Sequence, residues 1–286
     1  MALVKVEEIY QKARRGGYGV SGFCAENLDM ILAILSAAEE AQAPVVVVLW
    51  EADIQSVGAG YLEAIVKYGA GKIKVPVAFM LDHGVDKAAC LRSILDGHSC
   101  VMIDASHAAL QENIRITREV CEIAHPVGVM VEGELGTVRR SFENTGPYAV
   151  ETVFTDPEEV PCYTQQSGVD SVAISVGTES GIPLAPPHLD LERLSKIAGS
   201  TDAYLVIHGG SGISIEDLRA AIHCGATAFR FASEMRIVYL DALEKARKAY
   251  PPDFPDTRLL YEPARAAARE LIVKRMQHLG CAGKAW

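Results

Sequence analysis

The sequence predicts an α/β protein folded as a closed (β/α)₈ TIM barrel with an extra helix at its carboxyl end. Short runs rich in β-branched residues alternate with longer helical patterns along almost the whole chain. Several runs are nearly continuous in Val, Ile and Leu, which is typical of parallel strands that are covered on both faces. A doubly wound sheet is the alternative, but the first turn, YGVSGFCAEN, lacks its GxGxxG pattern. The predicted strands are Tyr18–Phe23, Pro44–Leu49, Pro76–Leu81, Ser99–Ile103, Gly128–Leu135, Val169–Ser175, Ala203–His208 and Thr227–Phe231.

Helical spacing of apolar residues fills most of the connections between these runs. The first residues, MALVKVEEIYQKARRGG, predict a short amphipathic helix. Further helices are predicted at Asn27–Ala41, Lys87–Leu95, Leu110–Ala124, Asp156–Gln166, Leu191–Ala198 and Ile215–His223. Beyond the eighth strand, Pro263–Gly280 predicts a helix that either packs on the barrel or contacts another subunit. The polar stretch Thr137–Thr155 is a long insertion, a kind of loop that is usually functional or mobile. No linker divides the chain, so residues 1–286 are expected to form one domain.

The composition narrows the class of protein. Hydrophobic residues make up 49% and charged residues 22% of the 286 residues, which is ordinary for an enzyme with a large core. The formal charge of −10 argues against nucleic acid as a partner, because phosphate backbones attract basic surfaces. No apolar run reaches the roughly 18 residues that a membrane span needs, and the first residues lack the features of a secretion signal. Seven scattered cysteines without a CxxC pair predict reduced thiols and a cytoplasmic protein.

Ionisable side chains follow the third to the eighth predicted strand, where each strand ends. Because the carboxyl ends of barrel strands meet at one mouth, these side chains are expected to converge there. The segments are Leu81–Gly84 (LDHG), Ile103–His107 (IDASH), Val131–Glu134 (VEGE), Gly177–Gly181 (GTESG), His208–Gly212 (HGGSG) and Arg230.

His83 and His208 are the histidines that lie at predicted strand ends. Together with the carboxylates of Asp104, Glu132 and Glu134 they suit a divalent metal with mixed nitrogen and oxygen ligands. Three protein ligands are enough for a catalytic site, because the remaining position is left for substrate. The alternative is that the histidines are hydrogen-bonded core residues.

Glu132 and Glu134 are two residues apart on one strand and therefore share a face with Met130. Two carboxylates so close repel each other unless a cation or a proton lies between them. The alternative is an ion pair with Arg139 or Arg140.

The stretch HGGSGIS, which ends at Ser214, favours anion binding. Glycines allow the backbone N–H groups to approach an anion, and the N-terminus of the following helix adds a positive dipole end. Barrels often bind phosphate between the loops that follow strands seven and eight. A simple strand-to-helix turn is the alternative.

Several motifs, in order along the chain, resemble the class II, metal-dependent ketose-bisphosphate aldolases, which include tagatose- and fructose-bisphosphate aldolases. The resemblance runs from end to end. The motifs are ENLDMILAILSAAEEAQAPVVV, LDHG, VMIDASH, NIRITREVCEIAH, VEGELG, VDSVAISVGT, HGGSG and the tail EPARAAARE…GCAGKAW. The resemblance implies a barrel, a Zn²⁺ ion and cleavage of a ketose phosphate to dihydroxyacetone phosphate and an aldehyde, through an enediolate that the metal stabilises.

The resemblance also implies roles for individual residues. Asp82 is expected to exchange a proton with the aldehyde oxygen, and Glu132 is the second predicted catalytic carboxylate. The predicted metal ligands are His83, His208 and Glu134, and a second cation is expected near Asp104. The predicted substrate-binding residues are Gly181, Gly209, Gly210, Ser211, Arg230 and Ser233.

The site departs from the family at several positions. Ser180 stands where the family has a ligand histidine, although the neighbouring Glu179 could substitute. Cys24 and Arg230 stand where it has asparagines, and Trp50 where it has a small residue. After VEGELG the family has glycines and a catalytic glutamate, and this chain has Arg139, Arg140 and Phe142 with Glu143 beside them.

These departures predict weak or absent cleavage of fructose 1,6-bisphosphate and better turnover of a monophosphate or an acidic sugar. Because Arg230 cannot lose its charge, it must face an anion or a carboxylate of its own protein. The predicted function is metal-dependent aldol cleavage or condensation of a phosphorylated or acidic ketose. An epimerase or isomerase on the same scaffold, and a metal-free sugar-phosphate-binding homologue, are the alternatives. The predicted partner is a small sugar phosphate or acidic sugar rather than nucleic acid or membrane, and a homodimer or homotetramer is expected.

Overall fold

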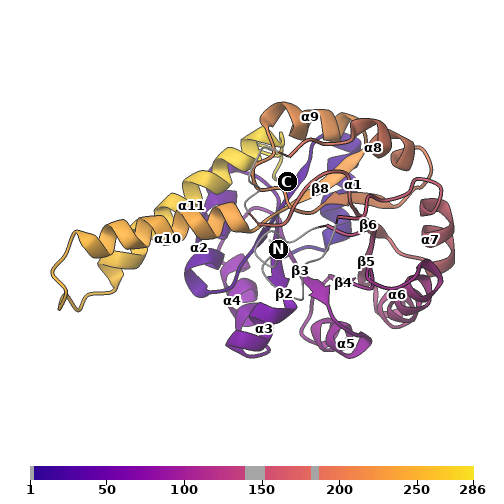
Figure 1. Cartoon of the computed structure of the whole chain (residues 1–286). Coiled ribbons are helices and arrows are strands. Elements are labelled where there is room, and N and C mark those ends of the chain that lie inside the picture. Colours follow the sequence, from indigo (N-terminus) through magenta and orange to yellow (C-terminus); the bar gives the residue numbers. More distant parts are fainter. Residues whose placement is uncertain (1–2, 139–151, 182–186) are drawn as a thin grey trace.

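Eight parallel strands close into a barrel in the sequential order β1 to β8, surrounded by helices (Figure 1). The computed structural model describes residues 3–138, 152–181 and 187–286. The strands are β1 (Val20–Cys24), β2 (Val45–Trp50), β3 (Val77–Gly84), β4 (Cys100–Ile103), β5 (Met130–Leu135), β6 (Ser171–Ile174), β7 (Tyr204–Ile207) and β8 (Ala226–Phe231). The predicted fold class is confirmed, and each predicted strand overlaps an observed one.

The core occupies the barrel interior and the layer between the strands and the helices. Val45–Leu49 of β2 are fully buried, because one face of the strand points into the barrel and the other packs under helices. This arrangement explains why the strands carry continuous apolar runs rather than alternating ones.

The helices that surround the barrel mostly match their predicted ranges. They are α1 (Val6–Gly16), α2 (Leu28–Ala41), α3 (Glu51–Val57), α4 (Tyr61–Ala70), α5 (Lys87–Leu95), α6 (Leu110–Ala124), α7 (Val160–Ser167), α8 (Leu191–Ala198), α9 (Ile215–His223), α10 (Ser233–Lys248) and α11 (Arg258–His278), with a 3₁₀ turn at His125–Val127. Side-chain caps define several starts, and Asn27, for example, accepts a hydrogen bond of 2.9 Å from Met30 N at the start of α2.

Three helices were not predicted, and one begins later than expected. The second connection holds both α3 and α4, separated by Gly58 and Gly60 with φ values of 108° and 86°. The helix expected from Asp156 begins at Val160, with Pro161 in its first turn. The third unpredicted helix is α10, which follows β8.

Helices α10 and α11 form a two-helix arm that extends well beyond the barrel (Figure 1). The base of α11 packs beside α2, and Arg265 Nη2 lies 2.7 Å from Asp29 Oδ1 across that contact. The C-terminal helix therefore packs on the barrel, which is one of the two roles that were predicted for it.

Most of the predicted insertion, residues 139–151, lies outside the described residues. Arg139, Arg140, Phe142 and Glu143, which were singled out as departures from the family pattern, belong to this segment. Thr137 and Val153 form an antiparallel bridge at the base of that insertion.

Among the helices of the described ranges, none is both long and apolar enough to cross a membrane.

Candidate active site

The end of β3 places two consecutive side chains in the same pocket. Successive side chains of a regular strand point to opposite faces, yet Asp82 and His83 both line the pocket at the barrel mouth. The pairing of β3 with β4 shifts register between Leu81 and Gly84, and His83 has a φ of 48°. This bulge at the left-handed residue turns His83 toward the mouth beside Asp82.

The pocket collects most of the residues that were predicted for the site. Those lining it are Asp82, His83, Gly181, His208, Gly209, Ser211, Arg230 and Ser233. Cys24, Trp50 and Ser180, three of the departures from the family pattern, line it as well. Glu132, Glu134 and Gly210 are buried beside or below it.

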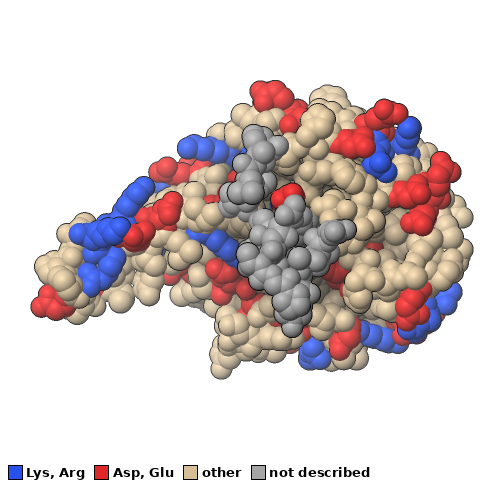
Figure 2. Space-filling model, in the orientation of Figure 1, with Lys and Arg blue, Asp and Glu red and all other residues tan. Residues whose placement is uncertain are grey.

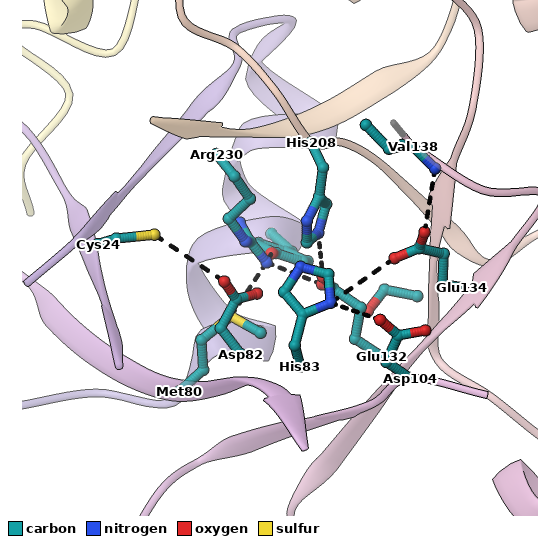
Figure 3. A network of polar contacts seen from close by, with 12 residues as sticks. Cys24, Met80, Asp82, His83, Asp104, Glu132, Glu134, Val138, His208 and Arg230 are labelled. Atoms are coloured by element: carbon teal, nitrogen blue, oxygen red, sulfur yellow. Dashed lines mark hydrogen bonds and ion pairs between the residues drawn. The ribbon is translucent and has the colours of Figure 1, made fainter. Parts of the chain in front are cut away.

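His83 lies among carboxylates from three strands (Figure 3). Its Nδ1 lies 2.7 Å from Asp104 Oδ2 and 3.9 Å from Glu134 Oε2. Burial opposes the charged ring, but the negative charges of Asp82, Asp104 and Glu134 raise the pKa of His83 to about 9. Burial would raise the pKa of Asp104, but the hydrogen bond with His83 holds it well below its usual range. The mouth therefore attracts positive charge.

Two overlapping groups of side chains can hold a metal ion. Asp82, His83 and His208 form one group, and His83, Asp104 and Glu134 form the other. Within each group the ligand atoms lie within 4.8 Å of one another. The two histidines lie close enough to share one ion, and their role as ligands stays a prediction. Glu134, the third predicted ligand, groups with His83 and Asp104 rather than with His208.

The donor set fits a divalent ion of the zinc type. It offers imidazole nitrogens and carboxylate oxygens, and Asp82 Oδ1 is buried with no hydrogen-bond partner among the described residues. Tetrahedral coordination with bonds of about 2.0–2.1 Å would bring ligand atoms to roughly 3.4 Å from one another. Side-chain shifts of about an ångström would close either group to that spacing.

A chain of polar contacts lies deeper in the barrel, below His208 (Figure 3). Glu132 is fully buried, and its Oε1 lies 3.1 Å from His208 Nε2. Its Oε2 accepts hydrogen bonds from Arg230 Nη2 at 2.8 Å and from Ser171 Oγ at 3.3 Å. Burial would raise the pKa of Glu132, but Arg230 and His208 hold it below the usual value. Glu132 is thus a buried, charged carboxylate beneath the mouth.

Arg230 faces a carboxylate of its own protein, which is one of the two arrangements that the sequence allowed. Its Nη2 contacts Glu132 and donates a hydrogen bond of 2.8 Å to the hydroxyl of Tyr10 on α1. Sequence reasoning did not predict Tyr10, because α1 lies far from β8 along the chain and its apolar pattern indicates only core packing. The substrate-binding role of Arg230 stays a prediction.

The glycine-rich loop after β7 has little room for side chains. Gly209 has a φ of 67°, and a Cβ there would lie 2.4 Å from the carbonyl oxygen of Glu179. The N–H of Gly210 donates to the Arg230 carbonyl at 2.8 Å, so this donor is used within the fold. Ser214 caps α9 by accepting a hydrogen bond of 3.0 Å from Asp217 N. The loop brings Gly209 and Ser211 to the pocket beside the start of α10.

Arg236 is a pocket residue that sequence reasoning missed. Its Nε donates to Glu26 Oε2 at 2.7 Å, its Nη2 lies 3.2 Å from Asp53 Oδ2, and its guanidinium lies 6.0 Å from the centre of the Trp50 ring. The available signal was its position one turn after Ser233, on a helix that the sequence did not predict. In Figure 2 the Lys, Arg, Asp and Glu side chains that are drawn in colour lie mainly around the rim of the barrel and on the arm, where both charges occur side by side.

Comparisons with known proteins agree with this architecture. The family model for class II fructose-bisphosphate aldolase matches residues 4–284. The fructose-bisphosphate aldolase of Geobacillus stearothermophilus is 35% identical over 290 residues, which cover 100% of this chain and 99% of that protein. The D-tagatose-1,6-bisphosphate aldolase subunit GatY of Klebsiella oxytoca is 31% identical, covering 99% of this chain and all of the relative.

A solved structure is also similar. The crystal structure of the YdjI aldolase from Escherichia coli K12 superimposes with a TM-score of 0.87 at 27% identity, over 99% of this chain and all of that one. Polar side chains gathered at the carboxyl ends of the strands of a closed parallel barrel are typical of a TIM-barrel enzyme. This chain belongs to the class II fructose-bisphosphate aldolase family. This membership supports aldol cleavage or condensation of a ketose bisphosphate, a lyase reaction of carbohydrate metabolism.

Proposed function

We propose that this chain is a divalent-metal-dependent aldolase whose substrate is a phosphorylated or acidic ketose other than fructose 1,6-bisphosphate. The observation that carries the proposal is the convergence of Asp82, His83 and His208 at the mouth, with ligand atoms within 4.8 Å of one another, in a chain of this family. His83 and His208 are the proposed nitrogen ligands of Zn²⁺, and Glu134 is the proposed carboxylate ligand. Asp104 supports His83 and provides the site for a second cation.

Asp82 is the proposed general acid and base. Its Oδ2 accepts a weak hydrogen bond from the Cys24 thiol at 3.9 Å, and its Oδ1 has no partner within the described part of the chain. In condensation Asp82 would donate a proton to the aldehyde oxygen, and in cleavage it would take the proton from the corresponding hydroxyl group. A buried carboxyl with one unused oxygen beside a pocket suits this exchange.

The remaining pocket residues orient the substrate. A bound divalent ion would supply Lewis-acid stabilisation of the enediolate charge that develops when the carbon–carbon bond breaks. Gly181, Gly209 and Ser211 bring the backbone close to the pocket, and Ser233 adds a hydroxyl at the start of α10. These groups form the proposed phosphate site, because backbone N–H groups and helix N-termini favour anions. Gly210 contributes the tight turn.

The wall of the pocket on the side of β1 and β2 supports the shifted specificity. Trp50 lines both this pocket and a neighbouring hollow of about 270 Å³ that contains Glu51, Gln55 and His107. Trp50 is also the register partner of Asp82 on the neighbouring strand, so it forms the part of the wall next to the proposed general acid. Arg236 places a cation at the same wall, although Glu26 and Asp53 already pair with it.

The deciding experiment compares the steady-state cleavage of fructose and tagatose 1,6-bisphosphates with a panel of ketose monophosphates and carboxylated ketose phosphates. The zinc content of the same preparation is measured in parallel. The proposal expects stoichiometric zinc and at least tenfold higher kcat/KM for a member of the panel. Efficient cleavage of either bisphosphate, at about 10⁴ M⁻¹s⁻¹ or above, would contradict the shifted specificity. A zinc-free protein that binds sugar phosphates without turnover would contradict the enzyme assignment.

We also propose that the chain forms a homodimer or homotetramer through the arm. The arm exposes large apolar side chains on both of its helices, at Ile237, Leu240, Leu259 and Tyr261. Sedimentation equilibrium of the wild type and of Leu240→Glu tests this. A dimer or tetramer that dissociates in the variant is expected, and a monomeric wild type would contradict the proposal.

A further inference from the structure

We propose that Arg230 is a positioning residue, which fixes the carboxylate of Glu132 so that Glu132 holds the His208 ring with Nδ1 facing the barrel mouth. The inference rests on the metal site of the proposed function. It assigns Arg230 and Glu132 to the support of a ligand rather than to contact with substrate.

The three side chains come from three strands and meet inside the barrel (Figure 3). Arg230 lies on β8, Glu132 on β5, and His208 directly follows β7. Arg230 Nη2 and Glu132 Oε2 are 2.8 Å apart, and Glu132 Oε1 and His208 Nε2 are 3.1 Å apart. Exposure is 3% for Arg230 and His208 and zero for Glu132, so bulk water does not compete for these contacts.

The contacts define the tautomer of His208. An ionised carboxylate only accepts hydrogen bonds, so the Nε2 that meets Glu132 must carry the proton. In the neutral ring Nδ1 then carries the lone pair, and only a deprotonated ring nitrogen can bind a metal. Because a carboxylate behind a ligand histidine also restrains the ring, its loss typically weakens metal binding by about 10–100-fold.

Arg230 determines where the carboxylate of Glu132 lies. A buried carboxylate without a cation is strongly unfavourable, and the nearest fixed cation of Glu132 is this guanidinium. The Tyr10 hydroxyl accepts a second hydrogen bond from the same Nη2 at 2.8 Å, which anchors the guanidinium to α1.

The neighbouring strand leaves space for the guanidinium. Gly22 on β1 pairs in register with Arg230, and a Cβ at Gly22 would lie 2.9 Å from Arg230 Nη1 and 3.1 Å from Arg230 Cδ. Gly22→Ala should therefore displace the guanidinium while every charge in the barrel is retained. It provides a second way to test the same contact.

The test uses the full-length protein with ¹⁵N-labelled histidine. The variants are Arg230→Met, Glu132→Gln, the double variant that removes both charges, and Gly22→Ala. Arg265→Met is the matched control, because it removes an arginine from a carboxylate pair with Asp29 on α2, outside the pocket. The ring ¹⁵N shifts of His208 are measured without metal, and zinc affinity is measured by competition with a chelator.

The wild type and the control should show a single Nε2–H tautomer of His208. Arg230→Met and Gly22→Ala should show a mixture of tautomers and about 10–100-fold weaker zinc binding. The double variant should recover most of the stability that either single change loses, because no unpaired charge stays buried, but it should not recover zinc affinity. This separates positioning from a purely structural role.

A single Nε2–H tautomer in Arg230→Met and Gly22→Ala would overturn the inference, as would zinc affinity within threefold of the wild type. If Arg230→Met does not fold, Gly22→Ala decides. If the wild type binds no zinc, the proposed metal site fails, and the ¹⁵N spectra of the metal-free variants still decide whether Arg230 and Glu132 fix the His208 ring.

Discussion

The Nδ1 atom of His83 lies 2.7 Å from Asp104 Oδ2, so the ring of a predicted metal ligand is held by a carboxylate from the next strand. The contact leaves Nε2 of His83 as the ring atom that is not engaged by Asp104. The centres of the His83 and His208 rings are 5.2 Å apart, with the ring planes near perpendicular at 79°. Both proposed ligand rings are therefore oriented by acidic partners, His83 by Asp104 and His208 by Glu132.

Asp104→Ala should weaken zinc binding by about 10–100-fold, because the His83 ring loses the acceptor that orients it. Chelator competition measures the change. Asp241→Ala, on the exposed side of α10, is the control and should bind zinc as the wild type does. Equal affinities for the two variants would show that Asp104 does not support the site.

Asp82→Asn should reduce kcat by about 10²–10⁴-fold with zinc content near that of the wild type, because it removes the proton-exchanging carboxyl and keeps the side-chain shape. Steady-state kinetics and metal analysis of the same sample measure both quantities. Activity within a few-fold of the wild type would refute the assignment. Loss of zinc together with activity would instead make Asp82 a metal ligand, a role that its grouping with His83 and His208 also allows.

Ser180→His should raise zinc affinity at least tenfold. Ser180 lines the pocket with His83 and His208, and an imidazole is a far better zinc ligand than a hydroxyl group. Isothermal titration of the metal-free proteins measures the gain. Unchanged affinity would mean that the site is already complete or that position 180 does not reach the ion.

Trp50→Ser should increase kcat/KM for a ketose bisphosphate by about tenfold, equivalent to ~1.4 kcal/mol, by opening the wall toward the neighbouring hollow. The chain has a second tryptophan, Trp286 near the carboxyl end, so Trp286→Ser is the matched control. If both variants cleave bisphosphates as the wild type does, the indole does not restrict which substrates the pocket accepts.

The stability of the protein should fall below pH 6.5 because of His98, which is buried at the opposite end of β4 from the active site. Burial lowers the pKa of His98 to about 4, while the unfolded chain binds this proton near pH 6.5. The unfolded state thus binds more protons between these values, and the contribution of His98 is lost as the pH falls through that window.

His98→Asn tests this, because an amide can replace the hydrogen bond that Nδ1 makes with Ser93 O at 2.8 Å. Between pH 7 and pH 5 the wild type should lose about 2 kcal/mol more unfolding free energy than the variant, measured by urea denaturation. Glu63, whose Oε1 lies 3.9 Å from His98 Nε2 and whose pKa is raised by burial, is present in both proteins. Parallel losses in the two proteins would show that His98 is protonated in the folded state.

The sequence by itself determined the barrel fold and which polar residues line its mouth. Strand period, helical spacing and turn residues are local properties, and a barrel brings all strand ends to one side, so Asp82, His83 and His208 could be placed together without coordinates. The family motifs indicated which reaction these residues would carry out.

Only the tertiary structure decided which charges neutralise one another. The partner of Arg230 could be an anion or an internal carboxylate, and the contact with Glu132 across the barrel selects the second. The β3 bulge that turns His83 toward Asp82, the grouping of Glu134 with Asp104, and the contact of Tyr10 with Arg230 were likewise not predictable. The physical reason is that such contacts join residues far apart in the chain. Their energies depend on distance and burial, which no local pattern encodes.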